Sequence, residues 1–473
     1  MGRIREVFLF ALMSVSAVAP SAHAGPTDLD EDEAKEKPAV ATPHRTYTLA
    51  ECLSLTDRNH PNLWAARARL AMYHAQLEEA TWAPYWQGWS ASVNFGVLPS
   101  IGGTPFYTRA PANLLNTSFT DGLNPVLQFA LSGMIPIYTF GKIDWTRRAA
   151  EAQVRMGEWD VEKFRQQARM DVRRAYYGAM LARDARYLLN DVLGRLNKAI
   201  ESVQSRLDKG EHGVEEVDRL RLEVYRDQVL ARSSEPDKGE TFAMAALRFM
   251  TGVAHDFDIP DQPLTRPDVI VKPVVSYLSA ARLFRPDVAE ARATLAQRRA
   301  LLEVARARLF PDVGLALSAS YSTAPSVVQQ DNAWVVDPFN RFTYTAALTA
   351  RWSLDILPGQ ARVAGAESSL EEARALERMT LGSLAVEVES AYGTMLDARH
   401  REEMWANAEH KAKGWISSVQ DAIDLGTKDE RDLMEPLRVF VDARINHMSA
   451  LMDYHLALSD LARVSGWDAS APR

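Results

Sequence analysis

Four segments of the chain alternate between apolar residues and small or polar residues. They span 89–97, 127–137, 313–321 and 342–352. In the last segment, for example, Phe342 and Tyr344 flank Thr343. A period of two places each type on its own face of a strand. The pattern therefore predicts four strands with one apolar face each, which suits either a membrane barrel or a soluble sandwich with one wet face.

Aromatic residues mark the ends of these segments that connect to the rest of the chain. They are Trp86, Trp89, Tyr138, Phe140 and Trp352. Each hairpin leaves a helical region and returns to it, so these residues are expected at one level. Amphipathic rings prefer the membrane–water interface, and long polar loops are typical of the outer side of a barrel. The hairpin loops at 99–124 and 322–340 are long and polar. We predict an aromatic belt at one membrane face.

Four strands are too few to close a barrel. An open strand edge is not tolerated in lipid, because its backbone groups find no water to bond. Each run is long enough to cross a bilayer as a tilted strand, which takes roughly 9–11 residues. If the strands lie in a membrane, several chains must therefore share one barrel. Three copies would supply an even number of strands, and this predicts a homotrimer.

Two very long helical segments follow the two strand pairs, over 143–208 and 361–424. The first contains no proline and would extend about 100 Å at ~1.5 Å per residue. A heptad spacing runs through both segments. In the second it is carried by Leu381, Leu384, Val388, Ala391, Met395 and Ala398. This spacing predicts helices that pack side by side, closely where the contact residue is alanine.

The same series of landmarks occurs twice, which indicates an internal duplication. Each copy has a proline-initiated Ala/Arg-rich helix, two alternating segments, a glycine (Gly141 or Gly359), a long helix with Tyr-Gly-x-Met-Leu, and a glycine turn (Gly210 or Gly426). The predicted division is a signal peptide at 1–24, a flexible acidic leader at 25–46, a first repeat at 47–255 with its hairpin at about 87–138, a linker at 256–275, a second repeat at 276–466 with its hairpin at about 312–354, and a tail at 467–473.

The N-terminal segment is typical of a cleaved secretion signal. Arg3 and Arg5 precede an apolar core at 7–18, and an A-x-A cleavage site lies at 22–24. No later stretch reaches the ~18 consecutive apolar residues of a membrane helix. We expect an exported protein without a membrane-spanning helix.

Composition and motifs argue against several classes of function. The net charge of −8 argues against a general nucleic-acid binder. Cys52 is the single cysteine and is expected to be a small buried residue. The 10 histidines lack ligand spacing, and no hydrolase, metalloprotease or phosphate-loop motif occurs. We therefore expect no enzyme activity, no cofactor and no metal. A soluble periplasmic coiled-coil adaptor or scaffold remains an alternative, as does an exported enzyme on a helical scaffold.

Over nearly all of the mature chain the sequence resembles the TolC-like outer-membrane efflux proteins. The resemblance rests on the segment 47–53 with Asn59-His60-Pro61, on Phe140-Gly141-Lys142, on Phe310-Pro311-Asp312, and on the turns near Gly210 and Gly426. It implies a mixed α+β membrane protein in which long helices form an α-helical barrel. The four strands of each chain would join a shared twelve-stranded trimeric β-barrel in the outer membrane.

The resemblance also implies partners and a gate. A periplasmic adaptor and an inner-membrane transporter would dock at the tip of the periplasmic helices, and substrate would pass outward. In this family acidic rings near the tip favour cations, and the matching positions here are Asp432 and Glu435. The segment 215–219 is their counterpart in the first repeat. Pro436 departs from the usual residue, and we expect it to kink its helix.

Overall fold

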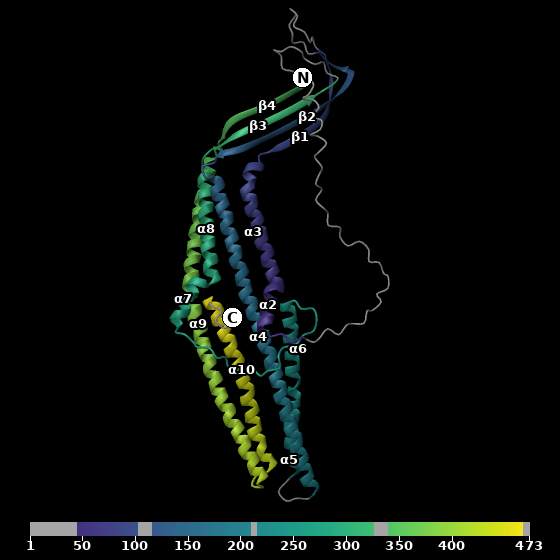
Figure 1. Ribbon diagram of the computed structural model, residues 1–473, viewed down its shortest axis with the longest axis vertical. Coiled ribbons are helices and arrows are strands. Elements are labelled where there is room, and N and C mark those ends of the chain that lie inside the picture. The colour runs from purple at the N-terminus through teal and green to yellow at the C-terminus, as the bar shows by residue number, and fades with distance from the viewer. Residues whose placement is uncertain (1–44, 103–115, 210–214, 326–338, 467–473) are drawn as a thin grey trace, which may run out of the picture. The chain divides into compact units, whose positions relative to one another are not determined.

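The computed structural model describes residues 45–102, 116–209, 215–325 and 339–466. The predicted signal peptide, nearly all of the leader and the tail lie outside these ranges, as does Gly210. The elements are α2 (Leu49–Asn59), α3 (Pro61–Trp86), β1 (Ser90–Gly102), β2 (Asn116–Tyr138), α4 (Lys142–Asp208), α5 (Glu216–Arg232), α6 (Ser234–Thr251), α7 (Val274–Phe284), α8 (Pro286–Ala307), β3 (Asp312–Thr323), β4 (Arg341–Arg351), α9 (Ile356–Asp424), the 3-10 helix η1 (Glu430–Leu433) and α10 (Met434–Ser465) (Figure 1).

Each half of the chain has two helices, two strands, one very long helix and a returning helical segment, in that order. The division into repeats at the boundaries given above stays a prediction. Within the described ranges, none of the helices has both the length and the apolar character needed to cross a membrane.

The four described strands form one antiparallel sheet in the order β1-β2-β3-β4. Because β2 pairs with β3, the sheet joins the two halves of the chain. One row across it contains Val93, Phe129, Tyr321 and Phe342, each opposite the next. The register shifts between Pro99 and Ser100 and again after Pro136, where proline lacks an amide hydrogen for the ladder. The four predicted strands are thus confirmed.

Several predicted strand ends were wrong. β1 runs to Gly102 and β2 begins at Asn116, both within the segment 99–124 that was expected to be a loop. Trp86 does not begin the first strand but is the last residue of α3. Phe140 does not end the second strand, which stops at Tyr138. Phe140 instead adopts a positive φ of 52°, next to Gly141 at 83°, so two left-handed residues turn the chain from β2 into α4. The belt residues therefore come from strand ends, a helix end and a turn.

The two long helices have 67 and 69 residues. In α9 the predicted heptad residues from Leu384 to Ala398 are buried in one core cluster, which confirms the contact line there, whereas Leu381 at its start is 39% exposed. Gly359 was expected to lie before this helix, and that was wrong. It lies in the first turn of α9, and a Cβ there would come within 2.5 Å of Leu309. This glycine allows close packing and does not end an element.

The helices pack in a consistent order. Towards the sheet the sequence of neighbours is α3, α4, α8 and α9, and towards the far ends it is α5, α4, α10 and α9. Thus α4 lies in the middle throughout its length. Among the described elements, α3 and α5 lie at one edge of this layer and α9 lies at the other.

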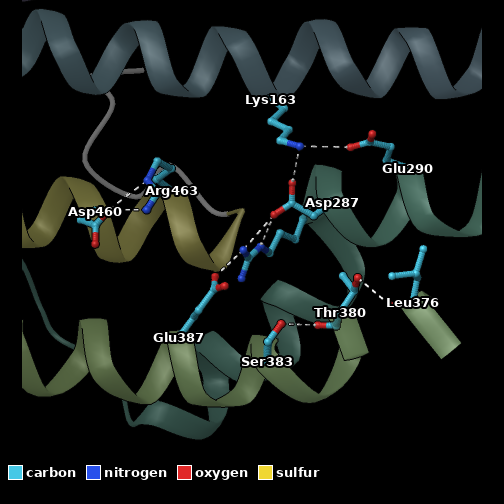
Figure 2. A network of polar contacts seen from close by, with 10 residues as sticks. Lys163, Asp287, Glu290, Leu376, Thr380, Ser383, Glu387, Asp460 and Arg463 are labelled. Carbon is cyan, nitrogen blue, oxygen red and sulfur yellow. Dashed lines mark hydrogen bonds and ion pairs between the residues drawn. The ribbon is translucent and has the colours of Figure 1, made fainter. Parts of the chain in front are cut away.

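Polar contacts hold α4 against the start of the second half (Figure 2). Lys163 of α4 lies 3.4 Å from Glu290 and 3.8 Å from Asp287, both on α8. Arg285, which precedes α8, pairs with Asp287 and with Glu387 of α9. The first turn of α8 is thereby tied to the helix on each side of it.

The segment between α6 and α7 crosses other elements without regular structure of its own. His455 of α10 contacts the Thr265 carbonyl at 2.8 Å, and its ring lies 4.6 Å from that of Tyr177 on α4. Arg183 of α4 donates to the Ile259 carbonyl at 3.0 Å. This crossing segment therefore fastens the two halves together across α4 and α10.

Candidate functional site: a two-faced sheet and a charged helix tip

One face of the sheet presents large apolar side chains that nothing in the described structure covers. Phe95 is 77% exposed, Tyr344 79% and Leu348 72%. Register pairs show that these residues share a face, because Leu348 lies opposite Leu315, and Leu315 opposite Ile135. Contiguous exposed apolar surface of this kind marks contact with a membrane or a partner.

The opposite face consists mainly of small and hydroxyl-bearing side chains. Ser90, Ser132, Ser318 and Thr345 form one row across all four strands. The hydroxyls of Ser90 and Ser132 are 2.9 Å apart, and those of Ser320 and Thr343 are 2.6 Å apart. A soluble sandwich would bury its apolar face against a second layer. Here no second layer of the described structure covers the apolar face.

The predicted belt residues gather only in part. The ring of Tyr138 lies 4.7 Å from that of Phe140, which stacks on Phe310 at 5.1 Å. Trp352 donates from Nε1 to the carbonyl of Leu309 at 3.0 Å. These residues therefore meet where the strands join the helices.

The two remaining tryptophans lie differently. The ring of Trp89 covers Gly133 on the apolar face, where a Cβ would come within 2.2 Å of it. Trp86 is 69% exposed at the end of α3.

A salt bridge at this junction was missed by the sequence reasoning. Lys142, the first residue of α4, lies 2.7 Å from Asp312 and donates to the carbonyl of Phe310 at 2.8 Å. The motifs Phe140-Gly141-Lys142 and Phe310-Pro311-Asp312, which lie far apart in the chain, thus form one structure. Both motifs adjoin predicted strands at their helix-proximal ends, and this shared level was the available signal. The contact fixes the start of α4 to the start of β3.

At the far end of the long helices, the segment before α10 contacts α4 and α5 of the first half. Arg431 of η1 lies 3.6 Å from Asp218 of α5, whose side chain is buried. Arg206 of α4 lies 3.4 Å from Asp429, just before η1. These two ion pairs connect the two helix tips. The acidic segments were predicted at the tip from the sequence, whereas the pairing of Arg431 and Arg206 with carboxylates of the other half was not.

The two predicted gate residues are both exposed at this tip. Asp432 lies in η1, where its carboxylate accepts a hydrogen bond from the Asp429 amide at 3.2 Å. Glu435 lies in the first turn of α10, where a carboxylate is favoured by the helix dipole. A capping role for Asp432 is therefore directly visible, and a gate role for either residue stays a prediction.

The expected kink at Pro436 was wrong. Pro436 is the third residue of α10, so it lies in the first turn. The amides of that turn have no partner within the helix, and proline there removes no hydrogen bond.

Contacts near the tip also change the pKa values of two side chains. Arg219 donates to Glu216, which lowers the pKa of that exposed carboxyl. Burial raises the pKa of the Tyr225 hydroxyl. Among the described residues, no group of three or more His, Cys, Asp or Glu side chains could hold a metal ion.

The comparison with protein families decides the identity. The model of the outer membrane efflux protein family matches residues 92–233 and 277–467. This chain belongs to the outer membrane efflux protein family. Each matched region contains most of one strand pair and the long helix that follows it, so the match covers the two-faced sheet and the tip described above. The family consists of transport channels. No curated protein matches the sequence.

Solved structures share the fold of this efflux family member. The open state of the Neisseria gonorrhoeae MtrE outer membrane channel is 16% identical, with a TM-score of 0.71 over 89% of each chain. CusC is 15% identical, with a TM-score of 0.70 over 89% of this chain and 92% of CusC. Its crystal structures concern the conformational changes that accompany folding and transmembrane channel formation.

A membrane protein from Pseudomonas aeruginosa is 19% identical, with a TM-score of 0.68 over 90% of this chain and 91% of that chain. The predicted fold class, TolC-like and mixed α+β with long helices and four strands per chain, is thereby confirmed.

Proposed function

We propose that this protein is one subunit of a trimeric outer-membrane channel in an efflux or secretion system. It would pass substrates from an inner-membrane transporter and its periplasmic adaptor across the periplasm and the outer membrane. One observation carries the proposal. The sheet exposes its apolar face and, in the described chain, leaves β1 and β4 as open edges. Lipid on that face and further copies at those edges would satisfy both features.

The edges of the sheet and of the helical layer support a closed ring. β1 connects to α3, and β4 connects to α9, so each strand edge continues into the helix edge on the same side. When the β4–α9 edge of one copy joins the β1–α3 edge of the next, the contact is heterologous. Such contacts close into a ring when the rotation between neighbouring copies divides a full turn. Three copies give an even-numbered barrel large enough for a lumen.

Assembly in the membrane tests this proposal. The protein would be extracted from outer membranes with mild detergent, and its mass measured under native conditions, with and without heating. We expect a heat-sensitive trimer that conducts ions in planar bilayers. A monomer that stays in the soluble periplasmic fraction would contradict the proposal and favour the adaptor or scaffold alternative.

The adaptor and transporter are proposed to dock at the tip. Farther along the helices from the tip, a cavity of about 770 Å³ lies between α4, α5, α6 and α10, and it is lined by Tyr225, Arg232, Arg438 and other residues. Exposed apolar residues of α5, such as Leu220 and Val224, lie on the same hairpin. A helical hairpin of an adaptor could use this surface, because an amphipathic helix binds an apolar groove flanked by charges.

Asp432 and Glu435 are proposed to filter cations at the tip. Three copies would turn each exposed carboxylate into a ring, and such a ring selects by charge. We expect the double variant Asp432→Asn/Glu435→Gln to lose cation preference in reversal-potential measurements. Glu403→Gln, exposed on α9 away from the tip, is the control and should change nothing. Equal selectivity in all three proteins would remove these residues from the filter.

The two ion pairs at the tip are proposed to hold it closed. Removing the charge at Arg431 leaves the buried Asp218 without this partner. We expect Arg431→Gln to raise the open fraction roughly two- to fivefold, the range for an interaction of up to about 1 kcal/mol at a half-exposed pair. Single-channel recordings measure it, and an unchanged open fraction would contradict the lock.

A further inference from the structure

The polar face of the sheet has a charge pattern that the channel proposal does not require. Among the strand side chains that the structure describes, this face carries Arg341, Arg351 and a single carboxylate, Asp312. Asp121 of β2 is not among these described side chains. Asp312 is already paired with Lys142 at 2.7 Å. The described wall is therefore positively charged, although the whole chain carries −8.

Register places both arginines on the hydroxyl-bearing face. Arg341 lies opposite Ser322, and Arg351 lies opposite Asp312. Both arginines are exposed. Guanidinium groups stay charged at any physiological pH.

The wall between the two arginines is neutral. Along β4 the intervening residues of this face are Thr343, Thr345, Ala347 and Thr349. The facing positions of β3 run from Gly314 to Ser322 and include no charge. No carboxylate lies within this stretch, and the one at its end, Asp312 opposite Arg351, is paired with Lys142.

The two arginines lie at opposite ends of the membrane span. They are the first and last residues of β4, an 11-residue strand. At ~3.3 Å per residue they are about 33 Å apart along the strand. A strand tilted by ~40° then covers about 25 Å of height, the typical height of the lipid-facing band of a barrel. One arginine would therefore lie at each mouth.

We propose that the barrel interior is an anion-preferring filter, formed by a ring of Arg341 at the outer mouth and a ring of Arg351 at the periplasmic mouth. This inference rests on the proposed trimeric channel, because only threefold symmetry turns each residue into a ring. Solutes bearing carboxylate or phosphate groups are favoured in the barrel, and cationic solutes are disfavoured. Charged walls concentrate counter-ions in this way.

Reversal potentials of the reconstituted trimer test the filter. Parent and Arg341→Gln/Arg351→Gln channels are compared under a KCl gradient at low ionic strength. We expect the chloride-to-potassium permeability ratio to fall at least about twofold in the double variant, because the Debye length of ~10 Å at 0.1 M lets wall charges reach the lumen. The difference should shrink near 1 M salt, where that length is ~3 Å.

Matched variants keep the test decisive. Arg341→Lys/Arg351→Lys retains the charge and should keep the parent ratio, while each single glutamine variant should give part of the shift. All variants keep the same tip, so any ion selectivity of the tip contributes equally to every measured permeability ratio. A conducting parent whose ratio the glutamine variants leave unchanged would overturn this inference alone. Absence of any pore, in the parent as in the variants, would overturn the channel proposal with it.

Discussion

The sheet and the long helices place their main rows of apolar side chains differently. β4 exposes Phe342, Tyr344 and Leu348, whereas its polar side chains lie on the other face. The exposed surface of α9 carries ion pairs such as Arg374–Glu371 and Arg401–Asp397. The apolar residues of its heptad line, such as Val388 and Met395, are instead buried against α7 and α10. Within one chain, the main apolar row of the sheet is thus exposed, whereas the main apolar line of the helix is buried.

The difference shows that each region is matched to its own surroundings. In water an exposed apolar side chain gains nothing, and charges keep the surface hydrated. In lipid the charged side chain is the costly one. The helices also contact each other through small residues, such as Ala152 and Ala179, that bring their axes close. Substitutions in the two regions should therefore have different consequences.

The largest effect is expected from a charge on the lipid side of β4. Ala346 and Ala347 are neighbours of the same type on opposite faces. Arginine at a membrane midplane costs about 2–4 kcal/mol on the lipid side. We therefore expect Ala346→Arg to lower the free energy of unfolding in lipid vesicles by about that much. Ala347→Arg, facing the lumen, should change it little. Equal losses would mean that the sheet does not face lipid.

A smaller effect is expected where helices approach closely. A Cβ at Gly157 of α4 would come within 2.7 Å of the Tyr73 ring on α3. We expect Gly157→Ala to cost about 1–3 kcal/mol through overpacking. Gly194 lies on the same helix, and a Cβ there would meet nothing within 4 Å. At that position alanine should stabilise by about 0.5–1 kcal/mol. Thermal denaturation compares the two, and stabilisation by both would exclude a tight contact at Gly157.

The smallest effect concerns His455 in the helical region. Burial lowers the pKa of this imidazole. The unfolded chain then binds the proton more readily than the folded one, so stability falls as the pH drops below the ordinary histidine value of about 6.5. We expect His455→Gln to be less sensitive to pH across this range. Urea unfolding at several pH values measures it, and parallel pH curves for both proteins would contradict it.

Local patterns explain the successes of the sequence reasoning. The alternation around Phe342 and Tyr344 predicted both the strand and its faces, because side-chain direction alternates along any strand. The heptad through Leu384 and Val388 predicted a buried contact line, because residues three and four apart lie on the same face of a helix. Failures came at boundaries: Gly359, Pro436 and Trp86 were interpreted from residue type, while first-turn geometry and packing decided their places.

The sequence by itself thus determined the strand faces, the lengths of the long helices and the order of elements, because periodicity acts between residues close in the chain. Only the tertiary structure decided which residues meet. Lys142 and Asp312 are 170 positions apart, and Arg206 and Asp429 are 223 apart. No local pattern encodes such pairs. They follow from the pairing of β2 with β3, which brings the helix-proximal ends of these strands together, and from the packing of α4 against α10, which brings the two helix tips together.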